Sequence, residues 1–232
     1  MADASVTVLQ TVLSRLKSVS GAVCVFDIDG TILDNKPRQA RIVREFGAAR
    51  GIELLQGARA DHWTTWNMSE AMRRMGLDDA AIEPIYKDAR AWWEARFFTS
   101  EYCVEDLPIR GAPAFVRAVA AAGAQVAYTT GRPESMRAGT LTVFAREGFP
   151  LPSDRAHLLM KQDPAQHDDA FKVENVVRLR AVGTVVAAFD NEPTHLNTYR
   201  REFPDARVVR VATEHSARPV ALLPGIEEID AF

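Results

Sequence analysis

The chain has 232 residues, 47% of them hydrophobic, which is enough for one large domain or for a core domain with a smaller insert. A formal net charge of −3 gives no bulk attraction to nucleic acid or to an anionic membrane, so neither is expected as a partner. The two cysteines suggest no disulfide framework, and the N-terminal residues lack a signal-peptide pattern, so the sequence predicts a cytoplasmic protein.

A helix and a buried strand are the first predicted elements. Residues 4–19 carry apolar side chains at helical spacing, and the apolar run of residues 21–27 (GAVCVFD) is typical of a strand buried in a parallel sheet. Acidic residues follow at once, with Asp27 and Asp29 two positions apart and Asp34 in the next turn. Two ionised carboxylates about 4 Å apart repel by roughly 4 kcal/mol at an effective dielectric of about 20, so a compensating group is expected nearby.

Residues 35–109 show no strand-like alternation, and we interpret them as a helical insert. Helical patterns cover three stretches, namely residues 36–51, 69–76 and 78–98. The last of them is expected to bend or split at Pro84, because proline removes a helical hydrogen bond. The predicted division is therefore a core domain of residues 1–34 and 110–232 and a helical domain of residues 35–109.

All four tryptophans of the chain lie in this insert. A helical domain of this size needs a core of its own, and tryptophan supplies a large buried area, so Trp92 and Trp93 are expected in that core. Trp63 and Trp66 lie in a less regular stretch and are the better candidates for contact with a substrate.

From residue 111 onward, predicted helices and strands alternate. The helical patterns are residues 111–123, 132–148, 171–183 and 192–203. The strand patterns are residues 124–131, 156–160, 184–191 and 206–212. Repeated strand–helix units predict an α/β fold with a parallel sheet and helices on both of its faces.

Polar side chains follow three of the predicted parallel strands. The carboxyl ends of such strands meet at one edge of the sheet, where ligands bind. This edge would collect Asp27, Asp29, Gly30, Thr31, Thr130, Gly131, Arg132 and Asp190. Lys172 stands at the start of the helix that precedes the Asp190 strand. Asp27 and Asp190 could coordinate Mg²⁺, a hard cation that accepts one or two carboxylates and keeps several waters, which would make the clustered acids favourable.

The sequence resembles the haloacid dehalogenase superfamily, specifically its phosphatase branch, in four motifs. They are VFDIDGTILD (residues 25–34), AYTTGRP (residues 127–133), Lys172 and FDNEP (residues 189–193). The resemblance covers residues 21–212 outside the insert, and the insert lies where that family places a helical cap domain. It implies a Rossmann-like α/β core with an inserted all-helical cap domain.

The resemblance also implies a role for each matched residue. Asp27 would be the nucleophile that takes the phosphoryl group as an aspartyl phosphate. Asp29 would be the general acid that protonates the leaving alcohol and then the base that activates water, and its backbone carbonyl would touch the metal. Thr130 would bind phosphate, Lys172 would neutralise the charge on Asp27 and the phosphoryl group, and Asp190 would bind Mg²⁺ directly or through water.

The expected substrate-binding residues are Gly30, Thr130, Gly131 and Arg132, which lie in the turns after the first two strands of the sheet. Backbone N–H groups in these turns and the Thr130 hydroxyl could hold phosphoryl oxygens. Arg132 either contacts the substrate or anchors its turn, and the sequence leaves both alternatives open.

Three further assignments stay open at this stage. Lys161 also follows a strand and is a rival to Lys172 for the catalytic lysine, although Lys172 is preferred because it opens the helix that leads to the Asp190 strand. Either Asn191 or Glu192 could support the metal, and Asn191 is preferred. His195 is expected to be a packed or surface residue.

The sequence therefore predicts a Mg²⁺-dependent phosphomonoester hydrolase that acts through an aspartyl phosphate on a small phosphorylated metabolite. Asp29 favours this chemistry, because an alcohol leaving group needs a proton and a halide does not. The alternatives are a sugar phosphomutase of the same fold and a non-catalytic phosphate-binding relative. The sequence indicates neither the substrate nor the oligomeric state.

Overall fold

The computed structural model describes residues 2–216 and 218–232 and divides the chain into two compact units. The α/β unit comprises Met1–Leu33, Pro108–Glu134 and Phe144–Phe232. The helical unit comprises Asp34–Leu107 and Ser135–Val143. The sequence did not indicate that residues 135–143 group with the helical unit. None of the helices in the described part of the chain combines the length and hydropathy needed to cross a membrane.

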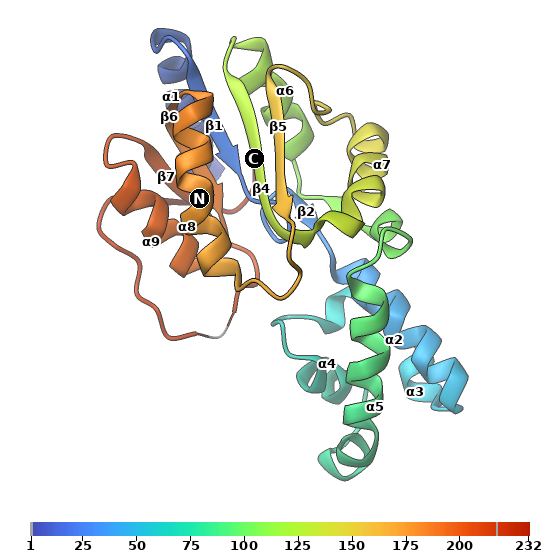
Figure 1. Cartoon of the computed structure of the whole chain (residues 1–232). Helices are drawn as coiled ribbons and strands as arrows, with labels where there is room; N and C mark the ends of the chain where they lie inside the picture. The colour runs from blue at the N-terminus through green and yellow to red at the C-terminus, as the bar shows by residue number, and fades with distance from the viewer. Residues whose placement is uncertain (1, 217) are drawn as a thin grey trace. The chain divides into compact units, whose positions relative to one another are not determined.

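A six-stranded sheet forms the centre of the α/β unit, with strand order β5-β4-β1-β6-β7-β8 and every neighbouring pair parallel (Figure 1). The strands are β1 (Ala22–Phe26), β4 (Gln125–Pro133), β5 (Ala156–Lys161), β6 (Thr184–Asp190), β7 (Arg207–Val211) and β8 (Ile226–Ile229). The predicted parallel sheet is confirmed. The edge strand β8 was missed, because the two central positions of its IEEI sequence are glutamates and show no apolar run.

Helices cover both faces of this sheet, as predicted. They are α1 (Ala2–Ser18), α6 (Ala112–Ala121), α8 (Asp168–Val182) and α9 (Pro193–Glu202). Helix α1 packs against α6, and α8 packs against α9, with α8 and α9 on the near face in Figure 1. Between the layers, the Phe26 ring stacks on Phe189 of the neighbouring strand with a centroid distance of 5.2 Å. The fully buried strand β1 lies between β4 and β6 and ends at the carboxyl edge of the sheet.

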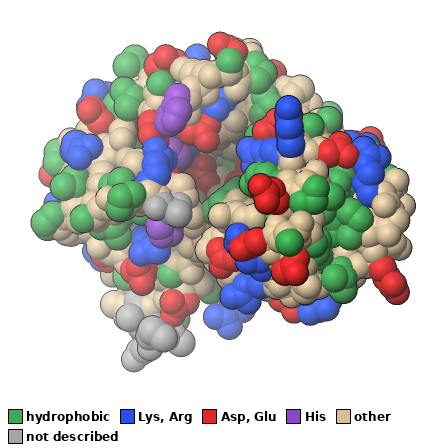
Figure 2. All heavy atoms as spheres, turned by 90° about the horizontal axis from the view of Figure 1, so that it is seen from below, with side chains coloured by type: hydrophobic (Ala, Val, Ile, Leu, Met, Phe, Trp, Pro, Cys, Tyr) green, Lys and Arg blue, Asp and Glu red, His purple; other side chains and the backbone are tan. Residues whose placement is uncertain are grey.

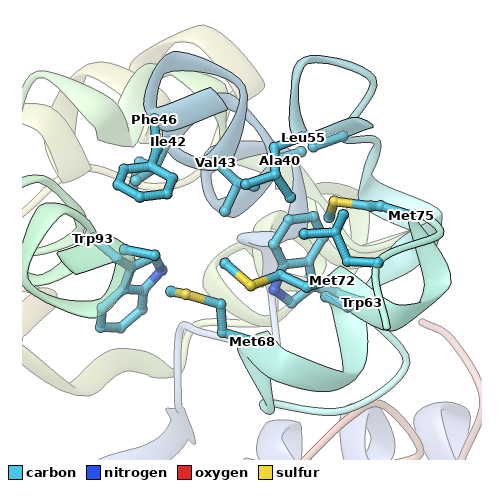
Figure 3. Packing of buried hydrophobic residues seen from close by; sticks show 14 of the residues in the cluster. Ala40, Ile42, Val43, Phe46, Leu55, Trp63, Met68, Met72, Met75 and Trp93 are labelled. Carbon is cyan, nitrogen blue, oxygen red and sulfur yellow. The ribbon is translucent and has the colours of Figure 1, made fainter. Parts of the chain in front are cut away.

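The helical unit has its own hydrophobic core (Figure 3). Its elements are α2 (Lys36–Arg50), α3 (Glu53–Gln56), η1 (Ala60–His62), α4 (Met68–Arg74), α5 (Asp79–Phe97) and η2 (Tyr102–Glu105). Helix α5 runs without interruption through Pro84, so of the two expected effects a split is wrong. Pro84 lies inside the helix, beyond the first turn, so α5 forms despite the helical hydrogen bond that a proline cannot donate.

Short strands β2 (Leu33–Asp34) and β3 (Leu107–Pro108) pair where the chain passes between the two units. The chain enters the helical unit a second time within the short helix η3 (Glu134–Met136) and leaves it within α7 (Arg137–Glu147).

The tryptophans of the helical unit only partly follow the prediction. Trp93 is a member of the core and Trp92 packs against it, as expected. Trp63 is only 1% exposed and lies among Met68 and Met72 (Figure 3), so its prediction as a substrate-contact residue is wrong. The irregular backbone around Trp63 misled the prediction, because a large indole can fill a core from a loop as well as from a helix. Trp66 is partly exposed.

A buried ion pair holds the first helix of the helical unit. The Arg38 Nε atom lies 3.0 Å from Asp106 Oδ1, and both side chains have no exposed surface. Arg38 also donates to the Phe97 carbonyl at 2.9 Å. Because a buried charge without its partner is costly, we expect Asp106→Ala to lower the free energy of unfolding by about 3–5 kcal/mol. Urea denaturation measures this loss.

Asp88→Ala is the matched control, because its ion pair with Arg50 is 2.7 Å long but about half exposed on both sides. Because water screens an exposed pair, Asp88→Ala should change the free energy of unfolding far less than Asp106→Ala. Equal losses in the two variants would show that the Arg38–Asp106 pair does not hold the helical unit together.

Candidate active site

Strand β1 delivers Asp27 to the carboxyl edge of the sheet, where its backbone N–H donates to the Phe189 carbonyl at 2.9 Å. The following turn closes on Ile28, whose carbonyl accepts from the backbone N–H groups of Thr31, Ile32 and Leu33. This tight turn requires the positive φ of +78° at Gly30, which L-residues rarely adopt. The Asp27 side chain is buried at the start of the turn.

Lys172 joins Asp27 to Asp190. Its ammonium Nζ donates to Asp27 Oδ1 at 2.7 Å and to Asp190 Oδ2 at 3.0 Å. Two further acceptors come from Thr129, the carbonyl at 3.0 Å and the hydroxyl at 3.1 Å. Lys161 instead pairs with Asp168. The structure therefore brings Lys172, and not its rival, to the predicted nucleophile.

The three groups form a buried cluster with an excess negative charge. Burial, opposed by the Lys172 ammonium, raises the pKa of Asp27 to about 7. Burial would also raise the pKa of Asp190, but the Lys172 ammonium outweighs it and holds that pKa below its usual range. When all three groups are ionised, two negative charges face one positive charge. A cation at the carboxylates is therefore favoured, and without one the cluster retains a proton up to near-neutral pH.

Asp29 points to Arg132 and not to Lys172. The guanidinium of Arg132 binds the Asp29 carboxylate through two contacts, Nε to Oδ2 at 2.7 Å and Nη2 to Oδ1 at 2.8 Å. Such a bidentate pair fixes both position and direction of the carboxylate. Arg132 therefore holds Asp29 of the first turn, and its contact with a substrate stays a prediction.

Thr130 and Gly131 lie near the end of β4, where the register with β5 shifts between Thr129 and Pro133. The Thr130 hydroxyl accepts from the backbone N–H of Arg132 at 3.1 Å. A Cβ atom at Gly131 would lie only 2.7 Å from the carboxylate of Asp168 at the start of α8, and this half-exposed side chain would have to move aside. The end of β4 and the start of α8 therefore lie close together.

Asn191 and Glu192, the two candidates for metal support, face different ways. The Thr31 hydroxyl can donate to Asp27 Oδ2 at 3.3 Å or to Asn191 Oδ1 at 3.4 Å, which places Asn191 next to the predicted nucleophile. The Glu192 carboxylate accepts from the backbone N–H and the hydroxyl of Ser216, at 2.9 and 2.8 Å. This geometry favours Asn191 over Glu192.

A family model of haloacid dehalogenase-like hydrolases matches residues 22–154, which is more than half of the chain. This chain is a haloacid dehalogenase-like hydrolase. No curated protein matches the sequence. The family assignment agrees with the resemblance seen in the sequence motifs.

Several solved structures share the fold of this hydrolase at low sequence identity. A predicted phosphoglycolate phosphatase from Haemophilus somnus is 14% identical, with 90% of this chain and 93% of that chain covered and a TM-score of 0.56. Protein Tyrosine Kinase A from Mycobacterium tuberculosis is 17% identical, with coverages of 90% and 94% and the same TM-score of 0.56.

CbbY from Rhodobacter sphaeroides, solved with phosphate, is also 17% identical, with coverages of 90% and 93% and a TM-score of 0.53. A chain of the Pnkp1/Rnl/Hen1 RNA repair complex matches at 14% identity and a TM-score of 0.49, and the 85% of the present chain that aligns spans only 43% of it. At these identities the three neighbours with TM-scores above 0.5 show a common fold and nothing about the substrate.

The donor set of the hydrolase fits a hard divalent cation. Asp27 and Asp190 supply carboxylate oxygens within reach of one ammonium, and Asn191 adds an amide oxygen. No group of three or more His, Cys, Asp or Glu side chains in the described residues is arranged to hold a metal ion. A site with two carboxylates suits Mg²⁺, which keeps several of its waters, better than a cation that needs a full protein cage.

Two buried residues of α9 lie beside the cluster of Asp27, Lys172 and Asp190. The sequence did not predict either of them there. His195 is 7% exposed, with Nδ1 3.4 Å from Asp190 Oδ2. The Tyr199 hydroxyl lies 2.9 Å from the Thr129 hydroxyl, which Lys172 also contacts. The spacing of four residues between His195 and Tyr199 puts both on one face of α9, which was the available signal. The prediction of His195 as a packed or surface residue missed its contact with Asp190.

Gly30→Ala tests whether the first turn must keep its shape. An added Cβ would overlap the Asn191 amide and lie 3.3 Å from the Thr213 hydroxyl. Because a displacement of about 1 Å near the reacting groups can cost around 10²-fold in rate, we expect kcat/KM to fall at least about tenfold. Steady-state kinetics on an aryl phosphate measures the loss.

Gly21→Ala is the control, because Gly21 has a similar positive φ of +64° but nothing within 4 Å of an added Cβ. It shares the backbone strain of Gly30→Ala and lies at the other end of β1. Unchanged kinetics in Gly30→Ala, or an equal loss in the two variants, would show that the Gly30 turn does not shape the active site.

Proposed function

We propose that this hydrolase is a Mg²⁺-dependent phosphomonoester hydrolase that forms an aspartyl phosphate on Asp27. One observation carries the proposal, namely that Asp27 and Asp190 meet on the buried Lys172 ammonium at the carboxyl edge of the sheet. A buried carboxylate next to a fixed positive charge suits attack on a phosphoryl group, because the charge offsets the negative charge that accumulates there.

Each residue of the cluster has a task in the proposed reaction. Asp27 attacks phosphorus through a carboxylate oxygen, and the bond from phosphorus to the leaving oxygen breaks. Lys172 donates hydrogen bonds to Asp27 and holds it in place during this step. The Thr130 hydroxyl and the backbone N–H groups of the two turns hold the phosphoryl oxygens. When bound at Asp27 and Asp190, Mg²⁺ would orient the phosphoryl group and neutralise part of its charge.

Asp29 would move the protons of both half-reactions. Protonated Asp29 would give its proton to the leaving alkoxide, and the resulting carboxylate would then take one from the water that cleaves the aspartyl phosphate. To carry the first proton, Asp29 must open one of its two contacts with Arg132. The bidentate contact with Arg132 defines the position of this carboxylate in the structure. We propose that Arg132 orients Asp29 in addition to lining the substrate site.

The helical unit is proposed to act as the cap that selects the substrate. The chain enters it at residues 33–34 and leaves it at residues 107–108, and residues 135–143 also group with it. Figure 2 shows Lys and Arg side chains interspersed with Asp and Glu, with no continuous basic surface on the face it presents. The formal net charge of −3 gives no bulk attraction to a polyanion, and we propose a small phosphorylated metabolite as the substrate.

A panel of phosphorylated metabolites and a generic aryl phosphate tests the proposal. We expect release of inorganic phosphate with Mg²⁺ and none with excess chelator. Full activity in the chelator would contradict the metal requirement. Transfer of the phosphoryl group between sugar hydroxyls, dependent on a bisphosphate, would indicate a phosphomutase. No turnover of any phosphomonoester with Mg²⁺ present would overturn the proposed function.

A further inference from the structure

His195 lies between two carboxylates at the point where the first turns of α8 and α9 meet. Its Nδ1 is 3.4 Å from Asp190 Oδ2, and its Nε2 is 3.2 Å from Asp169 Oδ1. Asp169 is the second residue of α8, and His195 is the third residue of α9. The ring thus connects a proposed metal ligand to a second carboxylate that the proposed reaction does not use.

Asp169 is itself held by several contacts. Arg218 donates to its Oδ2 at 2.6 Å and to its Oδ1 at 3.3 Å. The Thr194 hydroxyl donates to Oδ1 at 2.8 Å and accepts from Arg218 at 3.0 Å. A carboxylate with these partners is fixed in position, so it can hold the far side of the His195 ring.

The two carboxylate oxygens of Asp190 have different partners. Its Oδ1 accepts from the backbone N–H of Glu192 at 2.9 Å. Its Oδ2 accepts from Lys172 at 3.0 Å and faces the His195 ring. Lys172 contacts Asp27 as well as Asp190. Among the described residues, His195 is the side chain that contacts Asp190 and does not also contact Asp27.

Neither ring nitrogen of His195 has an aligned hydrogen bond among the described residues, although both are within 3.5 Å of a carboxylate. A buried polar atom without such a bond is destabilising, and a hydrophobic side chain in the same space would avoid that loss. A histidine that serves only as packing between α8 and α9 does not account for this arrangement.

We propose that His195 is a positioning residue that fixes the direction of the Asp190 carboxylate toward Mg²⁺, with Asp169 and Arg218 holding the ring. The inference rests on the proposed function, because it assigns Asp190 to the metal. Groups that orient a metal ligand typically change metal affinity by about 10–100-fold when they are removed. The effect should therefore appear in Mg²⁺ binding itself, without any substrate.

Two substitutions at position 195 separate positioning from packing. The Asn amide nitrogen can take the place of Nδ1 and keep the contact with Asp190, whereas the Gln amide reaches the place of Nε2 and keeps only Asp169. We expect His195→Gln to weaken Mg²⁺ binding by about tenfold and His195→Asn to recover most of the affinity. Calorimetric titration of the full chain with MgCl₂ measures both, and the melting temperature without Mg²⁺ reports the structural cost.

His157→Gln is the matched control, because His157 lies on β5 and contacts Gln125 away from the cluster. It should leave the Mg²⁺ affinity unchanged. Asp169→Asn is the second route if a His195 variant does not fold, and it should weaken Mg²⁺ binding several-fold with His195 still present.

The outcomes distinguish the inference from the proposed function. Wild-type affinity in both His195→Gln and Asp169→Asn, or equal losses in the Gln and Asn variants at position 195, would overturn the positioning role alone. Failure of the unaltered chain to bind Mg²⁺ would overturn the proposed metal site, and this inference with it.

Discussion

Asp27→Asn is expected to abolish phosphomonoester hydrolysis and to leave the fold intact. The asparagine amide keeps the shape of the side chain but is too weak a nucleophile to form the aspartyl phosphate. Uncatalysed phosphomonoester hydrolysis is so slow that enzymes accelerate it by up to roughly 10²¹-fold, so no measurable rate should remain. Phosphate release at high enzyme concentration measures the activity, and circular dichroism checks the fold.

Asp34→Asn is the control for this variant. Asp34 belongs to the same motif, but its carboxylate accepts from the backbone N–H of Lys36 at 2.9 Å, at the start of α2. We expect it to retain activity near that of the unaltered chain. Substantial turnover by folded Asp27→Asn would move the nucleophile to another residue.

Lys172→Met should remove activity and also destabilise the protein strongly. The substitution leaves Asp27 and Asp190 buried without the ammonium that both contact. Removing one partner from a buried ion pair typically costs about 3–5 kcal/mol, because a charge stays buried without compensation. Mg²⁺ binds the same carboxylates in our account, so it should raise the melting temperature of Lys172→Met more than that of the unaltered chain.

Lys161→Met tests whether this effect is specific to Lys172. Lys161 is largely buried, but its partner Asp168 is 52% exposed, so Lys161→Met leaves a carboxylate that water can reach and should destabilise the protein less than Lys172→Met. Its activity should persist. If Lys161→Met lost activity and Lys172→Met kept it, the assignment of the catalytic lysine would be wrong.

The alternation of strands and helices after residue 111 was readable because parallel strands are continuous apolar runs and glycine or proline marks the helix ends. The carboxyl-edge rule then predicted that Asp27 and Asp190 would lie close together. Lys172 was predicted to join them from its place at the start of a predicted helix. In the structure its ammonium contacts both carboxylates. Elements with a strong local pattern were predictable for this reason.

Contacts between distant side chains were not predictable in the same way. The turn of Arg132 was recognised, but its pairing with Asp29 depends on how two turns from separate strands meet. The burial of Trp63 likewise depends on core residues that come from other elements of the helical unit. His195 was judged from its own helix, although its neighbours come from β6 and α8. Local periodicity carries no information on such neighbours.

Chemical trapping of the intermediate tests whether Asp27 carries the phosphoryl group during turnover. The hydrolase is mixed with a phosphorylated substrate and Mg²⁺, quenched in acid during turnover and treated with borohydride, which reduces an aspartyl phosphate to homoserine. Peptide mass spectrometry should then find homoserine at position 27, and only when both substrate and Mg²⁺ were present. An unmodified Asp27 during demonstrated turnover, or homoserine at another position, would contradict the account.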